Sequence, residues 1–550
     1  MLNSYLLSNL KRLIRGVLNS FSYNTEKEHA VLNALATIID EPIDVLCTDS
    51  LDITEFQLQA ASLNEKTNKR KVKGVFYTDD DVVQYIIGNA FLNFIQNDIS
   101  NVFPLDDCVK LILAANGNST NALLKASVFD PTCGTGQFLL AALMIKVSIL
   151  EEKGELNDAL ILKLLATIHG NDIDKLSTEI AMVRLFLFVV PLLSDLKSFN
   201  KAATTLVSNF TTVYYVRSAM SEKSYNIIIG NPPYIEYGKL DERPPILLSN
   251  TYANVVFNSL GQLTSNGVMA YIIPLSFVST PRMKRLRKEV KDLSKKMMVI
   301  NFADRPDCLF VQVHQKLTIL LAVKGKEECE CKKYSSNYYY WYRSERTKLF
   351  DECEVYPSKY EFDSFIPKIG NKIEESIFDK IIRSQDETDF LKLQVPNNEG
   401  KNVYLNMRGT FWMKAFDKNP GSNEYKAYCF SKEFQPYVIC ILNSSLFFFF
   451  WIVVSDCWHI TGKELGNIKV RTDIDLTPFK ELARKLLDKL EKTKKYIGTV
   501  QCDYEYKHKY CKEEINAIDD TLAEVYGLTQ CELDYIKAYQ LKYRMSDGEE

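Results

Sequence analysis

The chain has 550 residues, a length that indicates two or three domains rather than one. Hydrophobic residues make up 46% and charged residues 25%, which is typical of a globular protein and excludes a largely disordered chain. The formal net charge of −3 means that any nucleic-acid binding would depend on a local cationic surface rather than on total charge.

The cysteines and the apolar segments bear on cellular location. There are 13 cysteines, and none forms the paired CxxC spacing of a zinc site, so we expect reduced, mostly buried thiols and no metal. The first 22 residues lack the apolar stretch and cleavage site of a signal peptide. The apolar run at residues 446–454 is far too short to span a bilayer. These features predict a cytoplasmic protein with no membrane segment.

The first half of the chain changes its hydrophobic pattern near residue 70. Residues 1–70 place Leu32, Leu35 and Ile38 at helical spacing, which predicts a helical N-terminal segment. Residues 71–325 alternate short apolar strands with amphipathic helices, which predicts an α/β domain with a doubly wound, largely parallel sheet. The strands expected there, and one helix, lie at residues 128–129, 225–230, 267–274 and 317–323, and at 137–150 for the helix.

The pattern changes again near residue 325. A polar and charged run at residues 324–333 precedes irregular segments, so we predict a domain boundary there. Residues 326–480 are expected to form a C-terminal domain of mixed α+β structure. Residues 481–550 return to a charged helical pattern that carries Leu486 and Leu490, and they predict a C-terminal helical segment.

A glycine-rich motif, DPTCGTG, follows the first of these strands at residues 130–136. Its glycines allow the backbone to turn tightly and to approach a ligand closely. Open α/β sheets bind nucleotide-like ligands at this position, although the spacing is neither a GxGxxG fingerprint nor a P-loop. Asp130, at the strand end, is placed to accept a hydrogen bond from the amino group of a cationic ligand. The alternative interpretation is a generic strand–turn–helix connection.

A second motif, GNDID, occupies residues 170–174, about one helix further along the chain. An acidic residue at the end of the next strand lies where a ribose diol would bind, and Asp172 is the candidate. The alternative is that an acid here caps a helix, a role that suits Asp174 because a helix is expected to start there.

The third motif, NPPY, spans residues 231–234 directly after an isoleucine-rich strand. Two prolines fix the backbone, and the carbonyls beside them add acceptors to that of the Asn231 side chain. Two converging acceptors suit an exocyclic amine, because accepting both N–H bonds favours a more nucleophilic nitrogen. Tyr234 offers a flat face on which a base can stack. The alternative is a rigid Pro-Pro turn with no chemical role.

Together these motifs resemble those of the gamma-type amino-methyltransferases, and specifically the DNA N6-adenine methyltransferases of restriction-modification systems. In that family a GxxYT segment precedes the glycine motif, and residues 74–78 match it. The resemblance implies a Rossmann-like S-adenosylmethionine-dependent domain at residues 71–325, with Asn231, Pro232 and Tyr234 as its catalytic motif. The cofactor-binding residues that it implies are Tyr77, Thr78, Asp130, Pro131, Cys133, Gly134, Gly136, Asp172 and Ile173.

Three further positions extend or depart from the family pattern. Phe310 matches a phenylalanine that stacks on the other face of the target base, and the alternative is an ordinary core residue. Asp79 stands where the family usually has proline. Ser218 stands where the family often has an aspartate that contacts the adenine of the cofactor.

The resemblance implies in-line attack of an adenine nitrogen on the sulfonium methyl, after the base has left the duplex. It implies double-stranded DNA as partner and target recognition by residues 326–480. It leaves open whether the enzyme is paired with a separate restriction endonuclease or acts alone. Bases would be read through their edges, with phosphate contacts from lysine and arginine. The candidates for those phosphate contacts are Arg408, Lys414 and Lys463, and the favoured alternative for each is a solvated surface charge.

Other functions share part of this signature. Protein-glutamine and RNA amino-methyltransferases use the same motif, and the long region after residue 325 argues against the glutamine enzymes. A cytosine-C5 enzyme needs a nucleophilic cysteine, and none stands beside Pro232 or Pro233. A fused nuclease would need a catalytic domain before residue 71, where the sequence is short and helical. A DNA-binding subunit without activity is expected to lose Asn231 or Tyr234, and both are present.

Overall fold

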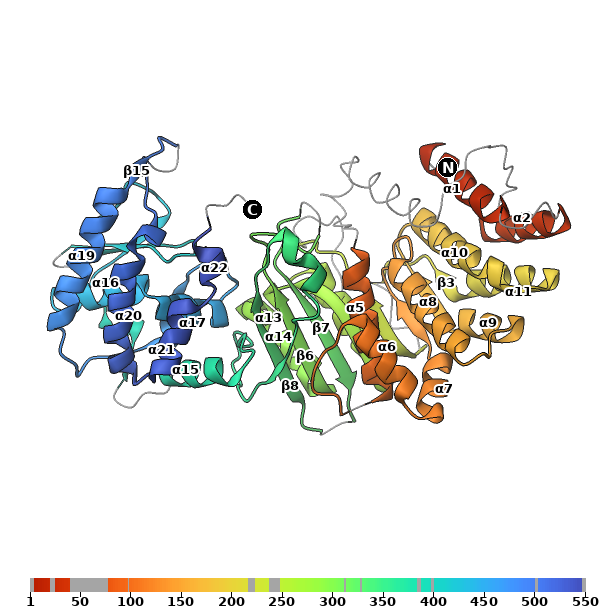
Figure 1. Cartoon of the computed structure of the whole chain (residues 1–550), viewed down its shortest axis with the longest axis horizontal. Helices are drawn as coiled ribbons and strands as arrows, with labels where there is room; N and C mark the ends of the chain where they lie inside the picture. The colour runs from red at the N-terminus through yellow and green to blue at the C-terminus, as the bar shows by residue number, and fades with distance from the viewer. Residues whose placement is uncertain are drawn as a thin grey trace.

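Figure 1 shows a central sheet with the N-terminal helices on one side and a helix-rich C-terminal region on the other. The computed structural model describes residues 4–19, 25–39, 78–96, 98–215, 223–236, 248–310, 313–326, 329–382, 387–396, 400–499 and 503–546.

The central sheet has nine strands in the order β3-β2-β1-β4-β5-β7-β6-β8-β9. From β3 to β5 all neighbours are parallel, whereas β7 runs antiparallel to both β5 and β6. The predicted doubly wound, largely parallel α/β sheet is therefore confirmed. The strands in chain order are β1 (Val128–Asp130), β2 (Ile168–Asn171), β3 (Phe210–Thr211), β4 (Tyr225–Gly230), β5 (Leu263–Pro274), β6 (Ser294–Phe302), β7 (Leu317–Lys324), β8 (Lys332–Tyr339) and β9 (Tyr356–Pro357).

The strands expected from the sequence lie within β1, β4, β5 and β7. Ile227, Ile228 and Ile229 of β4 are each 0% exposed. A strand that is covered on both faces reads as a continuous apolar run rather than an alternating one, which explains why the isoleucine run predicted β4 correctly.

The direction in which successive strands are added to the sheet switches between β1 and β4. From β1 it crosses through α8 (Gln137–Glu152) to β2 on one side, and from β4 through α12 (Thr251–Gln262) to β5 on the other. Because parallel crossovers are right-handed, α8 and α12 cover opposite faces of the sheet. The carboxyl ends of β1 and β4 therefore flank the point where open α/β sheets bind ligands.

Further helices cover the sheet. α5 packs against β4, β5 and α8, while α14 packs against β6 and α12. The bounds of these and the neighbouring helices are α5 (Asp80–Ile95), α6 (Leu105–Ala114), α7 (Gly117–Lys125), α9 (Asp158–Leu165), α10 (Lys175–Val189), α11 (Leu196–Asn209), α13 (Ser276–Ser279) and α14 (Lys284–Asp292).

The N-terminal segment is helical where it is described. It forms α1 (Ser4–Asn19) and α2 (Thr25–Ile39), and α2 packs against α11 beside the edge of the sheet. Leu35 and Ile38 of α2 are buried, in agreement with the helical spacing. Residues 40–77 lie outside the described residues.

The domain boundary predicted near residue 325 falls inside the sheet. The polar run at residues 324–333 connects β7 to β8, and β8 pairs in parallel with β6. The change of texture therefore marks a loop between two strands of one sheet. The sheet ends at β9, which pairs with β8, and the C-terminal region follows it.

The C-terminal region mixes helices with three small sheets. The sheets pair β10 with β14, β11 with β12 and β13, and β15 with β16. Their bounds are β10 (Glu387–Asp389), β11 (Val403–Asn406), β12 (Ala415–Phe416), β13 (Tyr425–Tyr428), β14 (Lys469–Arg471), β15 (Lys495–Tyr496) and β16 (Tyr504–Glu505). The helices are α15 (Lys372–Ile382), α16 (Gln435–Asn443), α17 (Ser445–Val454), α18 (Gly462–Asn467), α19 (Thr477–Thr493), α20 (Lys512–Tyr526), α21 (Gln530–Ala538) and α22 (Leu541–Arg544).

The core of the C-terminal region is α17, all of whose residues are buried. A helix that is apolar on every side belongs in a protein interior or in a membrane. Among the described residues no single helix is long and apolar enough to cross a membrane, although α16 and α17, bent by 64°, together match a span in length and composition.

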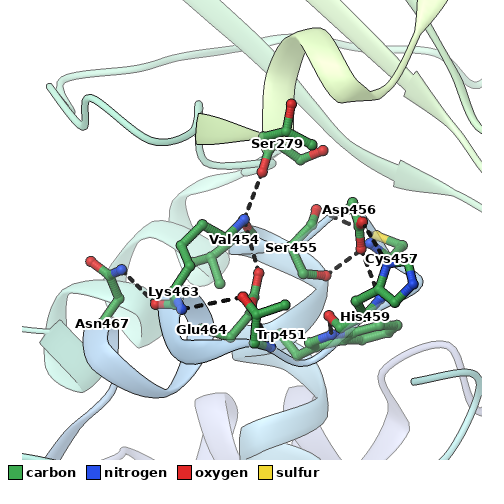
Figure 2. A network of polar contacts seen from close by, with 12 residues as sticks. Ser279, Trp451, Val454, Ser455, Asp456, Cys457, His459, Lys463, Glu464 and Asn467 are labelled. Atoms are coloured by element: carbon green, nitrogen blue, oxygen red, sulfur yellow. Dashed lines mark hydrogen bonds and ion pairs between the residues drawn. The ribbon is translucent and has the colours of Figure 1, made fainter. Parts of the chain in front are cut away.

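Lys463 joins the C-terminal region to the central sheet (Figure 2). Its Nζ donates to the carbonyls of Ser279 in α13 (2.6 Å) and Val454 in α17 (2.8 Å), and pairs with Glu464 at 2.8 Å. The side chain is only 11% exposed. Lys463 is therefore neither a phosphate contact nor a solvated surface charge, the two interpretations drawn from the sequence, because protein oxygens already surround its ammonium group.

Replacing Lys463 with methionine should destabilise the protein, because it leaves the buried Glu464 carboxylate without its cation. We expect the free energy of unfolding to fall by about 3 kcal/mol, measured by urea denaturation followed by circular dichroism. Lys418 is the matched control, since it is 70% exposed and lies 3.8 Å from Glu491. Lys418→Met should change the same quantity by less than about 1 kcal/mol, and an equal loss in both variants would contradict the bridging role.

Candidate active site

The three sequence motifs meet at one edge of the sheet. β1 pairs in parallel with both β2 and β4, so the segments that follow these strands leave at the same end. The glycine turn after β1, Asp172 after β2 and Asn231 after β4 are thereby brought together. Secondary structure alone thus assembles residues that are about a hundred positions apart in the chain.

The glycine turn depends on two left-handed backbone positions. Gly134 has φ +52° and Gly136 has φ +82°, a region that favours glycine. A Cβ at Gly136 would lie 2.7 Å from the Cβ of Ala181 on α10, whereas one at Gly134 would meet no atom within 4 Å. Gly136 therefore permits close packing of the turn on α10, and Gly134 leaves open space at the sheet edge.

Asp172 holds this turn in place. Its Oδ2 accepts from the Gly134 N–H and its Oδ1 from the Asp174 N–H, both at 2.9 Å. A carboxylate offers about four lone-pair sites, more than these two hydrogen bonds use. Asp174 caps α10 by accepting from the Ser177 N–H at 3.3 Å, which confirms the helix-cap interpretation for that residue. Ile173 between them is 61% exposed, an apolar surface beside the carboxylate.

Two residues that sequence reasoning missed brace the same turn. Asn171 is 1% exposed and donates from Nδ2 to the carbonyls of Pro131 (2.9 Å) and Val213 (3.0 Å). Arg184 of α10 is also 1% exposed and donates to the carbonyl of Thr135 at 2.5 Å. For the first, the sequence signal was an asparagine at a predicted strand end, and for the second it was an arginine within the apolar second half of α10.

Pro131 and Cys133, both predicted to bind the cofactor, occupy structural positions within the turn. The Pro131 carbonyl accepts from Asn171, and the Cys133 N–H donates to the Asn171 carbonyl at 2.8 Å. Burial raises the pKa of the Cys133 thiol well above its ordinary value, so the thiol stays protonated.

Asp130 connects the glycine turn to the Asn231 motif. It is 1% exposed, and its Oδ1 accepts from the Thr132 N–H at 3.0 Å. A Cβ at Gly230 would lie 2.6 Å from that oxygen, so the carboxyl group is in close contact with the backbone preceding Asn231. Burial, opposed by the Thr132 hydrogen bond and assisted by the charge of Asp172, raises the pKa of Asp130 well above its ordinary value. A cation bound here would relieve that cost.

The Asn231 side chain is oriented at both ends. Its Nδ2 donates to Thr78 Oγ1 at 3.0 Å, and its Oδ1 accepts from the Tyr234 hydroxyl, which also lies 3.0 Å from the Ile272 carbonyl. Burial raises the pKa of Tyr234 well above its ordinary value, so the hydroxyl remains a donor. An amide oxygen has two lone pairs, so Oδ1 can accept a second hydrogen bond.

The prolines present their carbonyls differently. The Pro233 carbonyl accepts from the Thr251 hydroxyl, and that hydroxyl in turn accepts from the Ile235 N–H at 2.9 Å. No residue in the described part of the chain donates to the Pro232 carbonyl. Asn231 Oδ1 and the Pro232 carbonyl are thus the two acceptors that the motif keeps available.

Tyr234 is half-buried, with its hydroxyl held by Asn231 and Ile272. Its ring meets the edge of Tyr252 at a centroid distance of 6.2 Å and an interplanar angle of 88°. Phe310, the other residue predicted to stack on the base, is 1% exposed and lies in the hydrophobic core. Burial therefore favours the core interpretation of Phe310, because its ring offers no free face.

The remaining predicted positions can be placed in part. Tyr77 and Ser218 lie outside the described residues. Asp79, which stands in place of the family's proline, is 3.5 Å from Arg346, and the same guanidinium binds Asp81 at 2.6 Å. Burial, partly offset by Arg346, raises the pKa of Asp79 to about 6. These pairs fix the start of α5 beside Thr78.

The structure offers no metal centre within the described ranges, where no group of three or more histidine, cysteine, aspartate or glutamate residues could hold an ion. Of the other predicted phosphate contacts, Arg408 is 54% exposed and pairs with Glu424 at 3.2 Å, and Lys414 is half-buried.

One segment of the chain is similar in sequence to a family of restriction-modification methyltransferases. Residues 166–308, about a quarter of the chain, match the sequence model of the family described as Eco57I restriction-modification methylase. The matched segment carries β2 to β6 with Asp172 and Asn231, and it leaves out the glycine turn. No sequence among the curated proteins matches this chain.

Solved structures to which this chain is similar include several restriction-modification enzymes. A nuclease-deletion mutant of the Type ISP enzyme LlaGI, in complex with a DNA substrate mimic, has a TM-score of 0.40 and 16% identity over 65% of this chain. The Type ISP enzyme LlaBIII bound to DNA has a TM-score of 0.41 and 14% identity over 74% of this chain. The EcoKI M protein has a TM-score of 0.34 and 13% identity over 63% of this chain and 64% of its own. The chain spans about a third of the length of the first two, at 32% and 34%.

Replacing Asp130 should raise the stability of the ligand-free protein but weaken its binding of S-adenosylmethionine. Because the pKa of Asp130 is raised on folding, the folded protein binds more protons than the unfolded chain over the range between the two pKa values. The buried carboxyl therefore costs no stability below its ordinary pKa and its full cost above the raised pKa. Asp130→Asn should therefore raise the melting temperature of the ligand-free protein at neutral pH. The same change should weaken binding of S-adenosylmethionine by about tenfold or more, measured by calorimetry.

In the unchanged protein that affinity should rise with pH from the ordinary carboxyl range upward, as Asp130 ionises. In Asp130→Asn the affinity should no longer rise with pH. Unaltered affinity and an unaltered pH profile in the variant would show that Asp130 does not meet the cationic part of the cofactor.

Proposed function

We propose that this chain transfers a methyl group from S-adenosylmethionine to the N6 amino group of an adenine extruded from double-stranded DNA. It would act as the modification component of a restriction-modification system, beside a separate restriction endonuclease. The observation that carries the proposal is the Asn231 amide, oriented by Thr78 and Tyr234, followed directly by the Pro232 carbonyl as a second acceptor.

The residues at the sheet edge fit the parts of the cofactor. The buried carboxyl of Asp130 suits the cationic methionine end, Asp172 the ribose diol, and the exposed Ile173 side chain an apolar face of the adenine. The open space at Gly134 allows close approach of the backbone. When bound, S-adenosylmethionine supplies an electrophilic methyl group. Thr78, which the resemblance assigns to the cofactor, accepts a hydrogen bond from Asn231 on the acceptor side.

The acceptor side suits a planar amine. Asn231 Oδ1 and the Pro232 carbonyl accept the two N–H bonds of the amine, which favours a nucleophilic nitrogen and stabilises the positive charge that develops on it. The Tyr234 hydroxyl fixes the direction of Oδ1, and its ring offers a face for the base. An adenine within a duplex cannot reach this edge, so it must be flipped out at a cost of a few kcal/mol.

DNA is favoured over the other amino-methyl acceptors by the restriction-modification family to which residues 166–308 are matched. The C-terminal region, which lies beside the sheet in Figure 1, is the part of the chain that would read the target sequence. The Asn231 motif itself does not distinguish DNA from RNA or a protein glutamine, because all three offer a planar amine or amide to the same two acceptors.

Asn231→Ala tests the catalytic assignment. The variant loses an acceptor for the attacking amine, so kcat for methyl transfer to DNA should fall by a factor of about 100–1,000 or more, measured with radiolabelled S-adenosylmethionine. Cofactor affinity should change little. Asn226, at the other end of β4, binds Ser127 and Thr264 and serves as a matched control. Asn226→Ala should lower stability but not turnover, and normal turnover in Asn231→Ala would refute the assignment.

Tyr234 combines two roles that substitutions can separate. Tyr234→Phe keeps the ring but loses the hydrogen bond to Asn231, so it should lower kcat while leaving binding of the flipped base intact. Tyr234→Ala should impair both. Fluorescence of 2-aminopurine at the target position reports base extrusion, and a full signal in the alanine variant would contradict a stacking role.

A further inference from the structure

A cavity of about 300 Å³ lies between the central sheet and the C-terminal region. The ends of β5 and β6 and the start of β7 supply one wall, which includes Ser276, Arg282 and Arg305. The loop after α17 supplies the other wall, with Trp458 and His459. The cavity opens on the same carboxyl edge of β5 that contacts Tyr234 through the Ile272 carbonyl.

Hydrogen bonds to Asp456 hold the loop that carries Trp458, and Figure 2 shows Asp456 and His459 of this loop. Asp456 accepts from the N–H groups of Trp458 (2.9 Å) and His459 (2.8 Å) and from His459 Nδ1 (3.1 Å). Burial opposes ionisation of Asp456, but these hydrogen bonds outweigh it and lower its pKa. Cys457 has φ +54°, a strained conformation for a residue with a side chain, and such strain concentrates at functional sites.

Two lysines fix this loop against both parts of the protein. Lys463 links the end of α17 to Ser279 of α13, and Lys368, which is 0% exposed, donates to the Ser455 carbonyl at 2.6 Å. The position of Trp458 relative to the central sheet is therefore set by buried hydrogen bonds rather than by a surface contact.

Trp458 differs from the other three tryptophans of the chain. Trp341, Trp412 and Trp451 are 1%, 8% and 0% exposed, whereas Trp458 is only half-buried and lines the cavity. Its ring lies 4.4 Å from Lys316 Nζ and 5.6 Å from the Arg305 guanidinium. A half-buried indole ring beside two cations is suited to stacking a base next to a phosphate.

Two guanidinium groups that line the cavity, those of Arg282 and Arg305, are accessible to an anion. Lys316 pairs with Asp304 at 2.9 Å, and Asp456 is engaged by its own loop, so both carboxylates are occupied. Arg282 is 50% exposed and reaches Glu236 only at 3.6 Å. Arg305 is exposed, and no carboxylate in the described part of the chain lies within ion-pair distance of it.

The cavity is also coupled to the candidate active site. The Ser276 side chain shares a 2.7 Å hydrogen bond with the Tyr252 hydroxyl, and the ring of Tyr252 meets Tyr234 edge-on. A ligand in the cavity therefore sits one aromatic residue away from Tyr234, where the proposed function places the flipped adenine.

We propose that this cavity holds the DNA nucleotide adjoining the extruded adenine, with its base stacked on Trp458 and its phosphate bound by Arg305 and Arg282. The inference rests on the proposed function and adds to it a DNA-binding site. Extrusion of a base displaces the neighbouring phosphates, and a fixed stacking face with two guanidinium groups would hold them in the extruded geometry.

The test uses the full chain with a short DNA duplex that contains a mismatched adenine, because such a base is the least costly to extrude. Binding should change the intrinsic tryptophan fluorescence, and Trp458→Phe should abolish that change while preserving affinity. Trp458→Ala should weaken binding about tenfold. Arg305→Ala should lower the slope of log affinity against log salt by about one. Tyr496→Ala is the control, since Tyr496 is a 72% exposed aromatic residue of β15 and should change none of these.

The outcomes separate this inference from the proposed function. If the unchanged protein binds and methylates DNA while Trp458→Ala and Arg305→Ala match it in affinity and salt slope, the cavity is not a DNA site and the proposed function stands. If the unchanged protein binds RNA but not DNA, both proposals fail. Should Trp458→Ala not fold, the exposed Arg305 and the conservative Trp458→Phe still give a decisive result.

Discussion

The buried carboxyl group of Asp130 constrains the whole arrangement at the sheet edge. It lies beneath the glycine turn and against the backbone of Gly230, so it touches both the segment proposed to hold the cofactor and the segment proposed to hold the methyl acceptor. A buried carboxylate without a cation is costly, and its pKa rises in response. A cationic ligand would remove that cost, which gives the site a physical preference for a sulfonium or ammonium group.

A second constraint is the attachment of the C-terminal region. Lys463 and Lys368 donate to carbonyls at the end of α17, and Lys463 also reaches Ser279 beside the central sheet. These contacts hold the Asp456–His459 loop over the carboxyl ends of β5 and β6. The proposed methyl transfer at Asn231 and the proposed contacts to the neighbouring DNA nucleotide would then be made by one rigid surface rather than by two independently moving parts.

Much of the central sheet could be predicted from the sequence, because β4 is a continuous isoleucine run and β1 leads into a glycine motif. The helix cap at Asp174 was also predictable, since capping is local. The boundary at residue 325 was not, because a polar loop between two strands looks like a linker. Phe310 and Lys463 depend on tertiary burial, which no local pattern reveals. The bracing by Asn171 and Arg184 likewise joins residues about 40–50 positions apart.

The central claim is that Asn231 and Pro232 direct methylation to an adenine amine in DNA. Its most direct test is a map of modified bases in the DNA of cells that express this chain, compared with cells that express Asn231→Ala. The account predicts N6-methyladenine at a defined sequence in the first and none in the second. Unmodified adenine in both, or modification that persists in the variant, would contradict it.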